Sequence, residues 1–219
     1  LRSPTELAGR FCAVVFSPAH LSLIKDGPQE KRRFVDTAVC QMKPRYIHML
    51  NQYHRVLDQR NRLLKDIAFQ HSLLDTLDIW DARLASFAAV LIKTRTTFVD
   101  QLRPVAQEVY AGISQEKEAL DFHYESSLSC DLSATIPEIE KQTLSCLQNG
   151  RQEYLWAGVT RSGPHRDDMD ITLSGSSARI FGSQGQQRGS VLAFKLAQCE
   201  MVRETIGEDP VVLLDDVMG

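Results

Sequence analysis

The chain lacks any apolar run close to the ~18 residues that a bilayer span needs, and it opens without a basic-then-apolar signal pattern. Its 12 glycines and 8 prolines are too few for a collagen-like or low-complexity protein. The five cysteines are odd in number and never spaced C-x-x-C, so the sequence encodes neither a disulfide framework nor a zinc ribbon. These absences predict a soluble globular protein of one large or two small domains in a reducing compartment.

A strong excess of one charge is also missing, because the formal net charge of the 219 residues is only −3. The charge is nevertheless uneven. Between Lys25 and Arg103, 14 Lys and Arg stand against 9 Asp and Glu, which leaves −8 for the remainder. The sequence therefore places a basic module inside an acidic protein.

Hydrophobic periodicity predicts an α/β body that carries a helical arm. Two long helices, each apolar at every third and fourth position and joined by a turn near residues 71–78, are expected to pack antiparallel. We expect a kink at Pro104 in the second. The predicted elements are a strand at 11–16, helices at 29–41, 44–67 and 77–111, a strand at 120–124, a helix at 137–149, a hairpin at 169–181, a helix at 184–206 and a buried strand at 211–214. The expected domains are residues 1–27, 28–115 and 116–219.

The last predicted strand, Val211 to Leu214, is followed by Asp215 and Asp216. A buried parallel strand with this pattern brings carboxylates to the carboxyl edge of a sheet, where open α/β folds bind ligands. One carboxylate there can hold a hydrated Mg²⁺ ion, and the next can orient or deprotonate an attacking water. The pattern is that of a Walker B motif, although an ordinary solvated strand end has the same residues.

A glycine-bearing turn, Phe-Gly-Ser-Gln-Gly-Gln-Gln-Arg at residues 181–188, leads into the helix at 184–206. Gly182 and Gly185 permit close backbone approach, and Ser183 can cap the helix. Free amides at a helix start attract phosphate oxygens, although an ordinary helix start would look the same in isolation. A signature motif followed by Walker B is the order of ABC-type ATPases, yet the chain contains no G-x-x-x-x-G-K-[ST] loop.

Five segments extend this pattern over nearly the whole chain. The most specific are the Gly-Pro-His-Arg-Asp-Asp string and the Phe-Gly-Ser-Gln-Gly-Gln-Gln-Arg string. The segments are residues 15–28, 32–36, 53–65, 162–168, and 181–188 with 195–197. In this order they resemble the RecF family, bacterial DNA replication and repair proteins that belong with the SMC-like ABC ATPases.

This resemblance implies an α/β fold, a partial ABC-type ATPase head of the P-loop NTPase kind with an inserted antiparallel long-helix arm. ATP and Mg²⁺ are the implied cofactors. Asp215 would hold Mg²⁺, and Asp216 would act as the catalytic acid or base. The signature motif, which touches the γ-phosphate of ATP held by the opposite subunit, would consist of Ser183, Gln184, Gly185 and Gln186.

RecF-like proteins dimerise when ATP is bound, bind single- and double-stranded DNA without sequence preference, and work with RecR and RecO to place RecA at gaps. The resemblance thus implies a cytoplasmic bacterial protein of DNA recombination and the SOS response. Against the family pattern the chain lacks the Walker A part of the head, and Ala19-His20 replaces two acids. We expect a fragment that alone neither binds ATP tightly nor hydrolyses it, whereas the intact parent would be a slow ATPase.

Basic residues of the arm region carry the DNA hypothesis. They offer many phosphate contacts beside few aromatic side chains, which predicts backbone binding without sequence preference. The same residues could equally solvate helix faces or pair with Asp36, Asp58 and Asp66. The candidates are Arg32, Arg33, Arg55, Arg60, Arg62 and Lys65.

Other classes of function stay open at this point. His165 with Asp167 and Asp168 invites a metal or nuclease site, although a turn at Gly163-Pro164 would let these acids cap or pair locally. A structural coiled-coil spacer would leave the Gly-Ser-Gln-Gly-Gln-Gln-Arg helix start unexplained. Another SMC-like ABC ATPase, or a non-catalytic DNA-binding arm module, is the alternative function.

Overall fold

A computed structural model describes residues 11–215 of the chain. The described residues form two compact units: unit 1 lies within residues 1–44, 95–125 and 168–219 as far as these are described, and unit 2 comprises residues 45–94 and 126–167. Among the described helices, none has both the length and the apolar character to cross a membrane.

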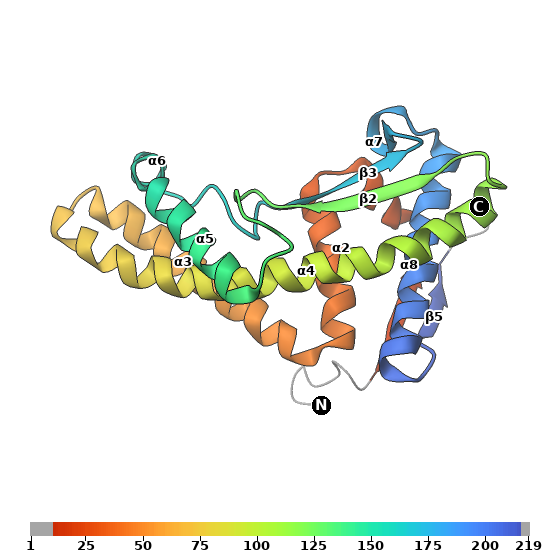
Figure 1. Cartoon of the computed structure of the whole chain (residues 1–219), viewed down its shortest axis with the longest axis horizontal. Coiled ribbons are helices and arrows are strands. Elements are labelled where there is room, and N and C mark those ends of the chain that lie inside the picture. The colour runs from red at the N-terminus through yellow and green to blue at the C-terminus, as the bar shows by residue number, and fades with distance from the viewer. Residues whose placement is uncertain (1–10, 216–219) are drawn as a thin grey trace. The chain divides into compact units, whose positions relative to one another are not determined.

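Unit 1 contains two small sheets (Figure 1). Strand β1 (Ala13–Phe16) runs parallel to β5 (Val211–Leu214), with Ala13 opposite Val211. Strand β2 (Leu120–Glu125) runs antiparallel to β3 (Asp168–Leu173), which also pairs with β4 (Ser176–Ser177). Side chains of β2 alternate between buried and exposed, as expected for a strand with one face on the core.

Helices cover these sheets within unit 1. Helix α2 (Pro28–Met42) begins with a proline that suits a first helical position, and α8 (Gln184–Ile206) ends at Gly207 in the left-handed conformation. The remaining elements of the unit are η2 (Pro18–Leu21), α1 (Ser22–Lys25), α7 (Ala178–Phe181) and the part of α4 (Leu77–Ser114) from Arg95 onward.

An aromatic cluster holds the core of unit 1 together. Phe194 of α8 lies between Phe34 of α2, at 5.9 Å between ring centroids, and Phe122 of β2, at 4.7 Å. All three rings are buried. Tilted and edge-to-face pairs of this kind add to the free energy gained from area burial. The cluster therefore ties α2, α8 and the β2–β3 pair into one core.

Unit 2 is helical in its described part. It contains nearly all of α3 (Pro44–Ile67), the short η3 (His71–Thr76) and the first half of α4. It also contains α5 (Ile136–Asn149) and α6 (Arg151–Ala157). A buried ion pair between Arg60 of α3 and Asp81 of α4 joins the two long helices. These are the arm helices that the sequence predicts.

Two sequence expectations need correction. The second half of the predicted hairpin is wrong: β4 has two residues, and residues 178–181 form the helical turn α7, where Ile180 is 71% exposed rather than paired. The predicted burial of residues 211–214 is also wrong, because β5 pairs only with β1 in the described chain and its four side chains are exposed. The expected domain limits at residues 28 and 116 stay a prediction; the compact units divide the chain at other residues.

Candidate functional site

The turn at the start of α8 forms a closed capping box. Ser183 is the N-cap, and its hydroxyl accepts a hydrogen bond from the Gln186 amide at 3.3 Å. In return, the Gln186 side-chain oxygen accepts from the Ser183 amide at 2.6 Å. The side-chain nitrogen Nε2 of Gln186 also donates to the Glu118 carboxylate. The turn is thus fixed by its own residues before any ligand binds.

Gly182 and Gln187 anchor this turn to the rest of unit 1. A β-carbon on Gly182 would lie 2.4 Å from the Ala178 carbonyl oxygen, so the backbone passes too closely for any other residue. Gln187 is buried, and its side-chain amide donates to the same Ala178 carbonyl at 3.1 Å. The predicted close backbone approach therefore occurs at Gly182, against the chain's own α7.

Gly185 is different, because a β-carbon there would meet nothing within 4 Å. It lies with Ser183 and Gln184 on the exposed part of the turn. Glycine inside a helix destabilises it by about 0.5–1 kcal/mol relative to alanine, and no contact within the described chain requires glycine here. The exposed helix start is open to an approaching group.

The predicted magnesium ligand Asp215 follows β5. Its backbone amide donates to the Phe16 carbonyl at 2.8 Å, which keeps the two strands paired to their ends, and the residue is exposed. Asp216, the predicted catalytic residue, lies outside the described residues. Helix α7 contacts α8, and β5 pairs with β1, which also contacts α8. No hydrogen bond joins Asp215 to residues 183–186 within the described chain.

The structure removes Arg60 from the predicted DNA-binding residues. Its side chain is fully buried, donates from Nε to Asp81 at 2.7 Å and from Nη1 to Thr160 at 2.7 Å, and stacks over the Tyr154 ring. A guanidinium held in this way offers no phosphate contact. The sequence pattern missed this because a charged residue on a long helix is usually solvated.

The other predicted basic residues differ in exposure. Arg55, Arg62 and Lys65 are exposed on α3. On α2, Arg33 is exposed and lies 3.9 Å from Glu30, whereas Arg32 is half-buried. The residues free to meet an external polyanion thus concentrate on α3.

The Gly-Pro-His-Arg-Asp-Asp string builds structure in each unit. In unit 2, the Tyr53 hydroxyl contacts Nδ1 of His165 at 2.7 Å, and Nε2 of the same ring contacts the Thr160 carbonyl at 3.0 Å. The carbonyl accepts only, so Nε2 carries the hydrogen and Nδ1 accepts from Tyr53. Burial lowers the pKa of His165 to about 4, which keeps the ring neutral. Asp167 accepts from both the amide and the hydroxyl of Ser127.

In unit 1, Asp168 pairs with Lys31 at 3.2 Å. The three side chains considered for a metal or nuclease site therefore each have a separate partner. Gly163 in the same string has φ +132°, and a β-carbon there would meet the Tyr53 hydroxyl at 2.8 Å. The structure gives this segment a scaffolding role that explains its specific sequence.

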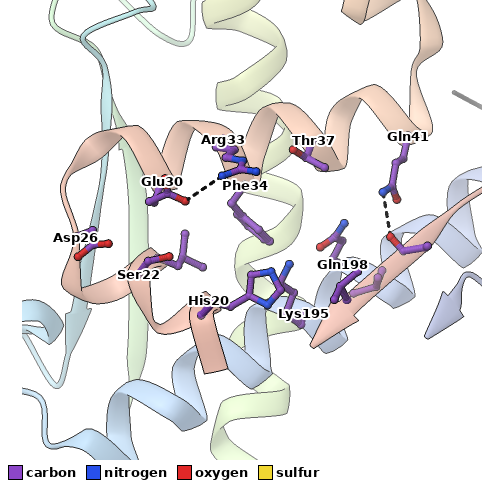
Figure 2. Close-up of a pocket in the computed structure, with 15 residues that line it drawn as sticks. His20, Ser22, Asp26, Glu30, Arg33, Phe34, Thr37, Gln41, Lys195 and Gln198 are labelled. Carbon is purple, nitrogen blue, oxygen red and sulfur yellow. Dashed lines mark hydrogen bonds and ion pairs between the residues drawn. The ribbon is translucent and has the colours of Figure 1, made fainter. Parts of the chain in front are cut away.

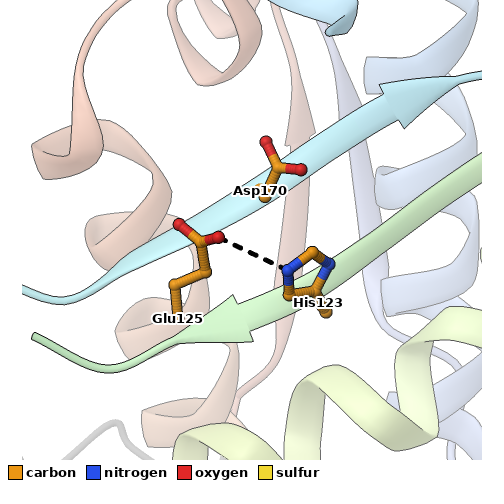
Figure 3. A group of neighbouring side chains, drawn as sticks. All are labelled: His123, Glu125 and Asp170. Carbon is orange, nitrogen blue, oxygen red and sulfur yellow. Dashed lines mark ion pairs between the residues drawn. The ribbon is translucent and has the colours of Figure 1, made fainter. Parts of the chain in front are cut away.

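A different group of potential metal ligands lies on the β2–β3 pair (Figure 3). His123, Glu125 and Asp170 bring one ligand atom each to within 4.8 Å of one another, and His123 Nε2 lies 3.4 Å from Glu125. Such a set could chelate a divalent transition metal. Sequence reasoning missed it, although the period-two alternation of residues 120–124 places His123 and Glu125 on one face, and β-pairing sets Asp170 opposite His123.

No family model matches the chain. The chain is 40% identical over all 219 residues to the DNA replication and repair protein RecF of Acetivibrio thermocellus, and 43% identical over 213 residues to that of Ruminiclostridium cellulolyticum. A solved structure of the recombination mediator protein RecF with ATP superposes on the whole chain with a TM-score of 0.93 at 34% identity.

The chain spans 59% and 57% of the two curated relatives, and 58% of the solved RecF chain. A second RecF structure gives a TM-score of 0.94 with the same coverage. These likenesses confirm the expected fold class, an α/β head of the ABC ATPase type with long helices. The match to proteins of one name runs through every element from β1 to β5, so the chain is similar to RecF proteins over its whole length.

Proposed function

We propose that this chain forms part of a RecF-type recombination mediator, an ATP-dependent dimer that binds DNA and helps RecO and RecR load RecA at single-strand gaps. The observation that carries the proposal is the start of α8, which the capping box of Ser183 and Gln186 holds in place and which is exposed at Gly185. The likeness to RecF proteins supports the DNA-repair role. Binding of ATP in solved RecF structures supports the cofactor.

The exposed turn has the chemistry to recognise a terminal phosphate. Within the described chain, no acceptor faces the backbone amides of Gln184 and Gly185. A helix start concentrates such amides and the positive end of the helix dipole at one point. The Ser183 hydroxyl and Gln186 stand beside them. In the proposed dimer these groups bind the γ-phosphate of ATP held by the other subunit, so ATP completes the interface.

The carboxylates after β5 supply the second half of the proposed site. Asp215 is exposed at the carboxyl end of a parallel strand pair, which suits a ligand of hydrated Mg²⁺. Bound Mg²⁺ would neutralise charge that develops on the phosphates. Asp216 would orient the attacking water and accept its proton.

Gly185→Glu tests the signature role in a RecF-length protein that contains this chain. The added carboxylate meets open space and favours a helix start, so folding should be unchanged, but it repels the incoming phosphate. We expect ATP-dependent dimerisation, measured by sedimentation velocity, to weaken by at least about tenfold. Gly185→Ala is the matched control and should dimerise nearly as well as the parent. Undiminished dimerisation of Gly185→Glu would refute the signature role.

DNA binding in this proposal uses the exposed basic residues of α3. Arg55 and Arg62 are separated by seven residues, which places them on one face of the helix, and Lys65 lies one turn further. Neither Arg55 nor Arg62 forms an ion pair within the described chain. Such residues contact phosphates and release counterions, which makes binding independent of sequence and dependent on salt.

Arg55→Glu/Arg62→Glu should therefore weaken DNA binding by the chain at least about tenfold. The slope of log K against log salt concentration should fall by about two, because about two phosphate contacts are lost. Electrophoretic shifts at several salt concentrations measure both quantities. Lys141→Glu/Arg161→Glu changes the net charge equally at exposed positions of the same unit and should have little effect. Equal loss in the two double variants would mean that net charge, rather than the α3 face, governs binding.

A further inference from the structure

A cavity of about 580 Å³ lies within unit 1 (Figure 2). Residues of β1, η2, α1, α2 and α8 line it. Apolar side chains such as Val14, Leu23 and Phe34 form part of the wall, and polar side chains from α2 and α8 form the rest. Cavities of this size and mixed lining are typical of sites for small organic molecules.

Lys195 of α8 is the unusual residue of the cavity. Only 9% of its surface is exposed, and the ammonium group lies 5.4 Å from the centre of the Phe34 ring. Within the described chain it has neither an ion pair nor a hydrogen-bond acceptor. Buried lysines are almost always paired, because an isolated ammonium is costly to remove from water. The cavity therefore holds a positive charge that lacks its counter-charge.

Neighbouring groups do not provide that charge. Burial lowers the pKa of Lys195 and raises the pKa of the Cys199 thiol one turn away, so the thiol stays neutral. Glu30 lies at 3.9 Å from Arg33, which partly neutralises it. Asp26 also lines the cavity, and no contact joins it to Lys195. Within the described chain, none of these groups forms an ion pair with the Lys195 ammonium, which leaves it available to an anion that enters the cavity.

Further polar groups face the same space. His20 Nδ1 accepts a hydrogen bond from the Ser17 amide at 3.1 Å, so in the neutral ring Nε2 carries the hydrogen and can donate. Gln198 is 97% buried, and its side-chain oxygen has no partner within the described chain. Figure 2 shows His20 and Lys195 side by side, with Gln198 on the same side of the cavity. Two donors thus converge next to a polar amide.

We propose that this cavity binds a small organic anion, whose carboxylate or phosphate group pairs with Lys195 and accepts a hydrogen bond from His20. The apolar wall around Phe34 and Leu23 holds the organic part of the ligand. Gln198 lines the cavity beside these two donors, and its side-chain amide can donate to the anion from nitrogen or accept a hydrogen bond from it at oxygen. Neither residues 183–186 nor Asp215 lines the cavity.

Thermal unfolding of the full 219-residue chain tests the site, with inorganic phosphate and phenyl phosphate as probes against chloride at equal ionic strength. At a probe concentration about ten times the dissociation constant, the midpoint should rise by about 3–6 °C. Phenyl phosphate should act at lower concentration than phosphate because its ring meets the apolar wall. No shift with either probe would overturn the proposal.

Lys195→Met separates a specific site from adventitious binding. Without probe this variant should melt at a higher temperature than the parent, because a buried unpaired charge is replaced by an apolar side chain of similar length. With probe its midpoint should not change. Arg203→Met, on the same helix but exposed, should keep the full response. An equal response of Lys195→Met would show that the anions bind elsewhere.

The pKa of His20 distinguishes anion binding from a purely structural role of Lys195, because only a bound anion would change it in the parent chain. Burial lowers the pKa of His20 first, and the charges of Lys195 and Arg33 lower it further. A bound anion should therefore raise the pKa of His20, which the imidazole proton resonances report during a pH titration. In Lys195→Met the pKa of His20 should be higher than in the parent before any phosphate is added, and phosphate should not change it. An unchanged His20 titration in the parent would contradict binding beside Lys195.

Discussion

Arg60→Ala is expected to destabilise unit 2 by about 3–5 kcal/mol, the cost of breaking a buried ion pair from one side. Asp81 is fully buried, and among the described residues only Arg151 would still form an ion pair with its carboxylate, at 2.6 Å from the Arg151 Nη2. Thr160 would lose the hydrogen bond from Arg60 and keep those that it donates to Asn61, and the Tyr154 ring would lose the guanidinium stacked over it. Urea titration followed by tryptophan fluorescence measures the loss, because both tryptophans, Trp80 and Trp156, belong to unit 2.

Arg62→Ala is the matched control for this prediction. It removes the same side chain two residues along the same helix, from an exposed position, and should change stability by less than about 0.5 kcal/mol. Arg60→Met/Asp81→Leu removes both charges and should recover a large part of the lost stability. If Arg60→Ala lowered the free energy of unfolding no more than Arg62→Ala does, water would have to reach the Arg60–Asp81 pair.

Acid is expected to destabilise unit 2 through His165. In the folded chain its pKa is about 4, whereas the ordinary value is 6.5. Between these values the unfolded chain binds a proton that the folded chain excludes, so the free energy of unfolding falls as the pH falls. The stabilisation is complete above about pH 6.5 and lost near pH 4, and the full difference is worth about 3 kcal/mol.

His165→Gln isolates this contribution from the other titrating groups. Glutamine can still meet Tyr53 or Thr160 but takes up no proton, so the difference from the parent in urea midpoint should shrink as the pH is lowered from about 7 to about 4.5. Trp80 and Trp156 again report on unit 2. A constant difference across this range would show that His165 becomes protonated without unfolding.

Local signals in the sequence predicted most elements closely. The limits of α8 agree because Ser183 starts it with a capping box and Gly207 ends it in the left-handed conformation. The spacing of apolar residues in α3 likewise extends over the whole helix. Where such signals are strong, propensity and packing favour the same structure.

Errors arose where packing, rather than local pattern, decides the structure. The residues after Gly175 satisfy a hairpin pattern, yet β4 ends after Ser177 because the chain turns into α7 and supports Gln187. The partners of Arg60 and Lys195 depend on residues far away in sequence. Lys195 nevertheless lies on α8 among buried residues that include Phe194 and Gln198. A charged residue on the buried face of a helix is a signal that the sequence already contains.

The β1–β5 pair has a consequence for local motion. Two strands on their own are marginally stable in water, so this pair depends on its contacts with α8. With its side chains exposed, β5 can separate from β1 while the aromatic core of the unit stays intact. Amide hydrogens of residues 211–214 should therefore exchange with deuterium well before those in the middle of α8, and the Asp215 carboxylate stands at the end of the segment that opens first.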